Sequence, residues 1–401
     1  MSIVAAVTTV VVLAGALSAA GSVGTARTRT RALPETKLPA PTTTRLDDLA
    51  FFNVEDGYGL FVHQGTNKCT VRVGHTSDAA ARFPALVSVA SYPCEANPTV
   101  SLLAFDDHGD GFLYGPKLYV THDGGASWTA EPQPGPVLSV EALGYSIWML
   151  EMSHPQGPGQ PGRLDVPLRL LESEDGGHTW SVVAVPRGAV EGGSGWLVRV
   201  SRTSAYLAGR PIFHKGRQLE RTSMWFTSDS GSTWSGRVIP CSSASSEMDL
   251  SAAPDGTLFD ECYDEPGTGM QLKSTLRSTN GGRSWQFRSR CQLTNNVKQP
   301  VVCTKDAQTE GYVSEIDAVS SSTVYLVGGR NSLDVSRDGG IRWAVVPPGL
   351  GSTAGGTSQV IFFDPSSGVV LGDGANEDPT VWSTTDGGAH WSARIPKLGS
   401  S

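Results

Sequence analysis

The chain repeats one short pattern six times, at intervals of 48 to 58 residues. The copies read THDGGASWT, SEDGGHTWS, TSDSGSTWS, STNGGRSWQ, SRDGGIRWA and TTDGGAHWS. Each has a Ser or Thr two positions before an acidic or Asn residue, a Gly two positions after it and a Trp five positions after it. These positions are Asp123, Asp175, Asp229, Asn280, Asp338 and Asp386, and Trp128, Trp180, Trp234, Trp285, Trp343 and Trp391. Such a period indicates a repeated supersecondary unit.

Each repeat is wider than this pattern. Upstream lie an apolar segment, a turn and a second apolar segment, as in residues 102–115, 317–329 and 360–372. Downstream of the Trp, a further short segment often ends at a Pro. Each unit therefore predicts four short strands, with the pattern at the turn between the third and the fourth. Repeated four-stranded units are typical of a β-propeller.

A seventh unit with a degenerate turn precedes the other six. Residues 49–62 show the strand–turn–strand pattern, and the segment HTSDAAARF keeps Asp78 and an aromatic Phe83 at the Trp position, whereas Ala80 replaces the Gly. Helical periodicity is scarce along the chain. We therefore predict an all-β fold, a seven-bladed β-propeller of four-stranded antiparallel blades over residues 46–396.

The pattern S/T-x-D-x-G-x-T/S-W resembles the Asp-box, or bacterial neuraminidase repeat. This repeat is found in sialidases, sortilin-type receptors, some endoglucanases and photosystem assembly factors. The resemblance spans essentially the whole folded chain and implies a propeller in which the repeated residues are structural: the Asp accepts amide hydrogen bonds within its turn, and the Trp is buried. Because families with this repeat have unrelated activities, the resemblance implies no particular reaction.

The ends of the chain lie outside the repeats. The first twenty residues are apolar and end in small residues, which is typical of a secretory signal, and we place this signal within residues 1–26, with cleavage after Ala20 or Ala26. The basic segment that usually precedes such a run is missing, so an uncleaved membrane anchor is the alternative. Residues 27–45 are rich in Pro and Thr and predict a flexible linker. Residues 397–401 are assigned to a C-terminal tail, and the protein to the cell exterior.

The six cysteines support export from the cytoplasm, because disulfides form in oxidising compartments. Three sequence-local disulfides suggest themselves: Cys69 with Cys94, Cys241 with Cys262, and Cys291 with Cys303. About fifteen pairings of six cysteines are possible, and free thiols in a cytosolic protein are the alternative. No group of Cys and His residues has the spacing of a zinc site. We therefore predict no metal and no cofactor.

A sialidase-like enzyme would need an arginine triad at the ring centre, an acidic Asp and a Tyr/Glu nucleophile pair. In such enzymes the first arginine typically lies in an Arg-Ile-Pro stretch ahead of the first repeat. Arg394-Ile395-Pro396 resembles that stretch, but it follows the last repeat, whose period places it in the outer fourth strand of the last blade. The densest acidic stretch, FDECYDEPG at residues 259–267, is interpreted as a solvated loop with Cys262 tied to Cys241, and binding of a cation or a basic partner is the alternative. We predict no catalytic residue.

Other acidic residues have structural interpretations. Asp47 and Asp48 are expected to cap the first strand of the first blade. Glu315, Asp317 and Tyr325 could form a nucleophile set, but their spacing does not demand one. Two carboxylates at a glycosidase site must lie about 5 to 10 Å apart, which a sequence cannot establish.

Turns account for the residues that resemble metal ligands. The segment DDHGDG at residues 106–111 resembles half of a calcium loop, but Lys117 occupies the position of the twelfth-residue ligand. His122 and His178 lie within repeats of the pattern, and His390 replaces a Ser or Thr there. All are interpreted as turn residues.

Binding is expected on the face opposite the repeated turns, where the long insertions emerge. One insertion is basic and partly aromatic, although the chain has a formal net charge of −8. Its candidate ligand-binding residues are Arg210, Phe213, His214, Lys215, Arg217 and Arg221. The negative net charge argues against nucleic acid as a partner. A membrane is expected to be a partner only through an uncleaved N-terminal segment.

Three functions remain open from the sequence. The leading hypothesis is a secreted, monomeric and non-catalytic scaffold that binds a protein or glycan ligand at the cell exterior. The alternatives are a sialidase-like exo-glycosidase with a diverged active site and an assembly factor for an extracytoplasmic complex.

Overall fold

The structure is a computed structural model that describes residues 43–154, 168–186, 195–209, 213–214, 217–218, 223–241, 245–264, 271–293, 301–305, 307, 313–328, 332–346, 350, 356–374 and 378–399. The described residues belong to one compact unit, Ala40–Ser401. Their regular secondary structure is entirely β. Over these ranges, the structure contains no helix that could cross a membrane.

Seven antiparallel sheets of four or five strands follow one another along the chain, and we number them blades 1 to 7. Blade 1 pairs β1 (Thr43–Phe51), β2 (Gly57–Gln64), β3 (Lys68–Thr76) and β5 (Leu86–Pro93). Blade 2 pairs β6 (Leu102–Phe105), β7 (Gly111–Tyr114), β8 (Leu118–Thr121) and β9 (Thr129–Glu131). Blade 3 pairs β10 (Val137–Leu143), β11 (Ser146–Met152), β12 (Leu168–Ser173) and β13 (Ser181–Val183). Blade 4 pairs β14 (Gly195–Arg199), β15 (Ala205–Gly209), β18 (Ser223–Thr227) and β19 (Ser235–Val238).

The later blades have the same order. Blade 5 pairs β20 (Ser245–Ala252), β21 (Leu258–Asp264), β22 (Lys273–Ser278), β23 (Gln286–Leu293) and β24 (Val301–Cys303). Blade 6 pairs β25 (Val313–Ala318), β26 (Val324–Gly328), β27 (Ser332–Ser336) and β28 (Ala344–Val345). Blade 7 pairs β29 (Gly356–Phe362), β30 (Gly368–Asp373), β31 (Pro379–Thr384) and β32 (Ser392–Arg394). Two small sheets pair β16 (Phe213–His214) with β17 (Arg217–Gln218), and β4 (Arg82–Phe83) with β33 (Lys397–Leu398).

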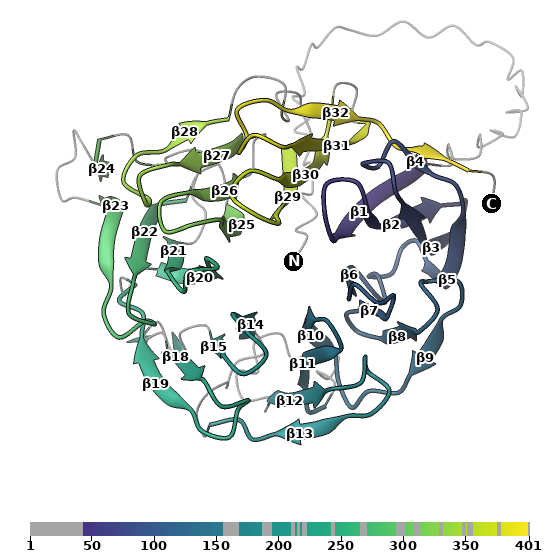
Figure 1. Ribbon diagram of the computed structural model, residues 1–401, viewed down its shortest axis with the longest axis horizontal. Helices are drawn as coiled ribbons and strands as arrows, with labels where there is room; N and C mark the ends of the chain where they lie inside the picture. The colour runs from purple at the N-terminus through teal and green to yellow at the C-terminus, as the bar shows by residue number, and fades with distance from the viewer. Residues whose placement is uncertain are drawn as a thin grey trace, which may run out of the picture. The chain divides into compact units, whose positions relative to one another are not determined.

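The first strand of every blade lies on the inside of a closed ring (Figure 1). Contacts run in order from β1 through β6, β10, β14, β20 and β25 to β29, and β29 contacts β1 again. The prediction of an all-β, seven-bladed propeller is therefore confirmed.

The hydrophobic core is divided among the interfaces between neighbouring blades. Seven buried clusters each join side chains of two adjacent blades. Between blades 3 and 4, Trp148 and Leu170 pack with Leu197 and Leu207. Burial of each such side chain contributes roughly 1.5 to 3 kcal/mol. A single blade cannot bury its faces alone, so the ring is stabilised as a whole.

In the described residues, no blade combines strands from both ends of the chain. Blade 1 consists of β1, β2, β3 and β5, and blade 7 consists of β29, β30, β31 and β32. Gln359 on β29 accepts the N–H of Leu49 at 2.9 Å and donates to the Leu49 carbonyl at 3.0 Å. A second contact joins the two ends of the ring, because β33 near the C-terminus pairs in parallel with β4 of the first unit. Strand β1 includes Thr43–Arg45, which the sequence had assigned to the linker, and β33 includes part of the assigned tail.

Each repeated turn is held by one local set of hydrogen bonds. In blade 2, the Thr121 hydroxyl donates to Asp123 at 2.7 Å and accepts the N–H of Gly125 at 3.0 Å, while Asp123 accepts the N–H of Ser127 at 2.8 Å. The same three bonds recur in blades 3 to 7. The Ser127 hydroxyl also donates to Asp123, at 2.6 Å, and this bond, with those from the Ser127 N–H and the Thr121 hydroxyl, lowers the pKa of Asp123 to about 2.

The repeated turns keep a left-handed backbone even where Gly is replaced. Ser230 has a φ of 54° and Ala80 a φ of 61°, although L-residues seldom adopt this region. The degenerate first turn therefore has the conformation of the others. The surrounding turn imposes the backbone angle.

Candidate functional site

Acidic side chains recur on the innermost strands of the ring. Asp48 lies on β1, Glu141 on β10, Asp249 on β20, and Glu315 and Asp317 on β25. Burial, together with the charges of Asp317, Asp249 and Asp48, raises the pKa of Glu315 well above its usual value. Carboxylates from three blades therefore influence one another in the ring.

Four of these carboxylates bind the backbone of the next blade. Asp48 accepts the N–H of Leu103 at 2.7 Å, and Asp249 accepts the N–H of Ile316 at 3.1 Å. The remaining pairs are Glu315 with Val360 at 2.9 Å and Asp317 with Phe362 at 2.9 Å. We call these four side chains the inter-blade carboxylates. Each satisfies an amide on a strand that has no sheet partner on that side.

The position of Asp48 corrects one prediction. It was expected to cap its own strand, but it lies inside β1 and bonds to blade 2. Its neighbour Asp47 forms an ion pair with Arg45. Acidic residues that alternate with apolar ones, as in the first strands β20 and β25, were the available signal for such inner carboxylates.

Desolvation changes the protonation of the inner carboxyls. Burial raises the pKa of Asp48, Asp249 and Asp317 to about 7, although the amide hydrogen bonds act in the opposite direction. Burial also raises the pKa of Glu141 to about 7, against the charge of Arg199. These groups therefore titrate near neutral pH, whereas exposed carboxyls titrate near pH 4.

The acidic stretch 259–267 is not the solvated loop that the sequence suggested. Its first part is the buried strand β21, in which Asp260 and Glu261 are fully or almost fully buried. Glu261 accepts a hydrogen bond from Thr275 at 2.7 Å, and burial raises its pKa to about 8. Residues 265–267 lie outside the described part of the chain.

Asp260 lies against a disulfide. One carboxyl oxygen is 3.5 Å from Cys241 Sγ and 3.4 Å from Cys262 Sγ, and these sulfurs are bonded to each other. Disulfide sulfurs carry no proton to donate, and the other oxygen of Asp260 has no hydrogen-bond partner. Burial, with the charges of Glu261 and Asp249, raises the Asp260 pKa well above its usual value. Burial thus favours the neutral form of Asp260, and the bonded cysteines cannot ligate a metal.

Three arginines with defined hydrogen-bond or ion-pair partners lie in three different blades. Arg45 in blade 1 pairs with Asp47, and Arg169 in blade 3 pairs with Glu151 at 2.6 Å. Arg199 in blade 4 donates to the carbonyl of Ser146 at 2.7 Å. Arg45 and Arg199 lie on the inner strands β1 and β14, whereas Arg169 lies on β12, the third strand of blade 3.

The remaining residues considered for catalysis have structural roles. Arg394 lies on β32, the exposed outer strand of blade 7, where the repeat spacing put it. It borders a groove with Arg82 and Lys397 at the seam of the ring. Tyr325 is fully buried and donates to the carbonyl of Gly387 at 2.9 Å. It therefore holds blade 6 to the repeated turn of blade 7.

The predicted basic loop falls between β15 and β18. Within it, Phe213–His214 and Arg217–Gln218 form the antiparallel pair β16 and β17. Arg210, Lys215 and Arg221 lie outside the described residues. The ligand-binding assignment of these residues remains a prediction.

Three disulfides join Cys69 to Cys94, Cys241 to Cys262, and Cys291 to Cys303. These are the sequence-local pairs, and the structure leaves no cysteine free. Such bonds indicate an oxidising environment.

No family model matches the chain, and no curated protein matches it. Solved structures do resemble it. A structure of YCF48 bound to a D1 peptide has 18% sequence identity and a TM-score of 0.52, covering 86% of this chain and 94% of that one. YCF48 from Cyanidioschyzon merolae has 17% identity and a TM-score of 0.50, covering 88% and 98%. The β-propeller domain of the Trilobed protease from Pyrococcus furiosus, described as having an open velcro topology, has 8% identity and a TM-score of 0.53, covering 87% and 97%. These similarities establish the fold.

Proposed function

We propose that this chain is a secreted propeller of the Asp-box type that binds a peptide or protein segment and catalyses no reaction. The observation that carries the proposal is the use of the inter-blade carboxylates as hydrogen-bond acceptors for the next blade. A group that completes the backbone bonding of the scaffold is poorly placed to act also as nucleophile or general acid.

The arginines support the same conclusion. Sialidase-like chemistry requires three guanidinium groups around one substrate carboxylate. Arg169 lies on the third strand of its blade, not on the inner strand, and Arg45, Arg169 and Arg199 each have their own partner. The described residues thus favour binding over hydrolysis.

The ligand is proposed to be an acidic segment bound at the β16–β17 hairpin. This insertion contains four Arg or Lys residues in a chain of net charge −8, so it would attract a negatively charged partner. The fold similarity to YCF48, seen bound to a D1 peptide, supports a peptide as the ligand class and keeps the assembly-factor role as a form of the same proposal. This support is an analogy of fold.

Binding can be tested with the full chain and synthetic peptides of graded negative charge. We expect the most acidic peptides to bind best and to weaken as salt increases. A variant with Lys215→Glu, Arg217→Glu and Arg221→Glu should lose at least about tenfold in affinity, or about 1.4 kcal/mol. The matched control is Arg394→Glu, on an exposed outer strand of another blade. Equal binding by both variants would contradict the proposed site.

A sialidase-like glycosidase is the second candidate. It is favoured by the pKa values of Asp48 and Asp317, raised to about 7, because glycosidases use such carboxyls as general acids. A fluorogenic sialoside tests it directly. Turnover by the wild type that Asp317→Asn abolishes would overturn the non-catalytic proposal.

A further inference from the structure

Three potential metal ligands meet where blades 2 and 3 adjoin. Asp110 ends the turn between β6 and β7, His122 lies in the repeated turn of blade 2, and His178 lies in the repeated turn of blade 3. One ring nitrogen of each His and one Asp110 oxygen all lie within 4.8 Å of one another. This cluster lies at the ends of the blades opposite the long insertions.

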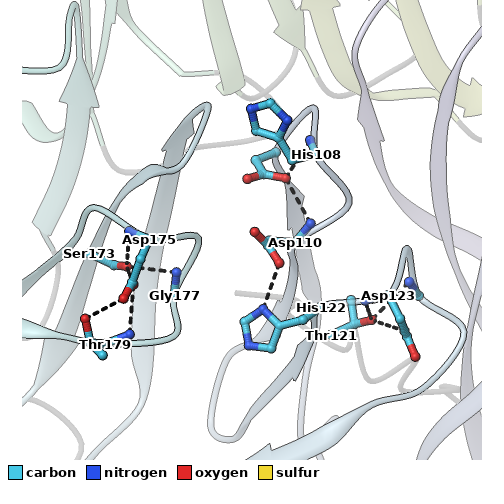
Figure 2. A network of polar contacts seen from close by, with 11 residues as sticks. His108, Asp110, Thr121, His122, Asp123, Ser173, Asp175, Gly177 and Thr179 are labelled. Atoms are coloured by element: carbon cyan, nitrogen blue, oxygen red, sulfur yellow. Dashed lines mark hydrogen bonds and ion pairs between the residues drawn. The ribbon is translucent and has the colours of Figure 1, made fainter.

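Hydrogen bonds hold the backbone of Asp110 in place. The backbone N–H of Asp110 donates to the Asp106 carboxylate at 2.9 Å, and the backbone carbonyl of Asp110 accepts the N–H of Asp106 at 2.9 Å. One carboxylate oxygen contacts His122 Nδ1 at 2.7 Å (Figure 2). The other lies so close to Gly176 that a side chain there would collide with it. Asp110 therefore lies between the repeated turns of two blades.

The two imidazoles come from different blades but lie together. The rings of His122 and His178 stack with centroids 3.8 Å apart and 18° between their planes. Both residues are exposed, so their rings can turn without disturbing the core. His108 takes no part, since it stacks on Tyr145, with ring centroids 3.8 Å apart.

We propose that Asp110, His122 and His178 form a binding site for a divalent transition-metal ion of the Zn²⁺ class. Imidazole and carboxylate together suit Zn²⁺ and its neighbours, whereas Ca²⁺ and Mg²⁺ prefer oxygen ligands alone. Metal–ligand distances of about 2.0 to 2.2 Å require donors roughly 3.3 Å apart. The donors lie within 4.8 Å of one another in the structure, so binding requires the exposed rings to rotate toward the ion.

The site departs from the sequence-based prediction that no metal is bound. Spacing along the chain could not reveal it, because 56 residues separate His122 from His178. The ion would cross-link blades 2 and 3 on the face away from the β16–β17 hairpin. Three protein ligands leave a coordination position for water or a partner's side chain.

The test is a calorimetric titration of Zn²⁺ into the full chain after chelator treatment and removal of any histidine tag. We expect one equivalent to bind and the Tm to rise. His178→Ala should lower the affinity at least tenfold, and Asp110→Asn should do the same. Co²⁺ in place of Zn²⁺ should give visible absorption bands that disappear in His178→Ala.

The matched control is His390→Ala. His390 is also exposed in a repeated turn and contacts Asp386 at 2.6 Å, with both residues in one blade. It should leave Zn²⁺ affinity unchanged. A wild type that binds no Zn²⁺, or equal affinities in His178→Ala and His390→Ala, would overturn the proposal. Because His178 is exposed, loss of folding is not expected to obscure the result.

Discussion

The carboxylate of Asp317 in blade 6 accepts the backbone N–H of Phe362 in blade 7 at 2.9 Å. The bond joins strands β25 and β29, which lie side by side without forming a ladder with each other. Side-chain acceptors therefore perform, between blades, the task that backbone carbonyls perform within them.

Replacing this acceptor should destabilise the ring. Asp317→Ala leaves the Phe362 N–H without its acceptor, at a cost of about 1 to 3 kcal/mol in the free energy of unfolding. Asp317→Asn keeps an acceptor oxygen and should lie close to the wild type at acidic pH. Denaturant unfolding measures both. Equal losses in the two variants would show that charge, not hydrogen bonding, matters at this position.

Stability should decrease between mildly acidic and neutral pH. The pKa of Asp48 and of Asp249 is about 7 in the folded chain, as a result of burial, against about 4 in the unfolded chain. Over this window the folded state retains protons that the unfolded state releases. The free energy of unfolding therefore falls by up to about 1.4 kcal/mol per pH unit for each such group.

At lower pH the free energy of unfolding is expected to change in the opposite direction and to fall as the pH falls. The pKa of Asp123 is lowered to about 2 by hydrogen bonds from Ser127, so its contribution is lost as the pH falls below about 4. Stability should be greatest near pH 4 to 5 by this reasoning. Unfolding curves collected from pH 3 to pH 8 measure the profile, and a rise in stability from pH 5 to pH 7 would contradict it.

Ser230→Gly should stabilise the protein. Ser230 has a φ of 54°, where the aligned residue of blade 2 is Gly124 with a φ of 68°. Relief of about 1 to 2 kcal/mol of backbone strain exceeds the entropy cost of about 0.5 to 1 kcal/mol that Gly introduces. The net gain should be about 0.5 kcal/mol and should appear as a higher Tm. The converse change, Gly124→Ser, should lower the Tm, and no difference between the two variants would refute the argument.

Gln359 should matter for closure of the ring. Gln359→Ala removes both bonds to Leu49, a buried residue, and should cost about 2 kcal/mol or more. Gln359→Glu keeps the acceptor but places a carboxylate against the Leu49 carbonyl, so it should also destabilise. Gln64→Ala, at an exposed strand end, is the control. Urea unfolding of the three variants compares them, and wild-type stability in Gln359→Ala would exclude this role.

The blades and their repeated turns could be predicted because their interactions are local. The bonds of the turn in blade 2 join residues within four positions of Asp123, so residue types alone specify them. Even the degenerate turn with Ala80 was recognisable from its spacing. The position of Arg394 on an outer strand followed from the same period.

Burial was less predictable. The stretch containing Asp260 and Glu261 has the composition of a solvated loop, yet it forms β21, a buried strand inside blade 5. Acidic composition usually indicates exposure, and here the packing of blade 5 against both blade 4 and blade 6 excludes water.

The amino-acid sequence by itself determined the number of blades, the place of each turn and the cysteines that can pair, because a short period and local hydrogen bonds are written in neighbouring residues. Tertiary structure alone decided what the acidic residues do. Asp48 meets Leu103 across 55 positions, and His122 meets His178 across a blade interface. Closure of the ring brings such residues together and removes water from the inner carboxyls, and this sets both their partners and their protonation.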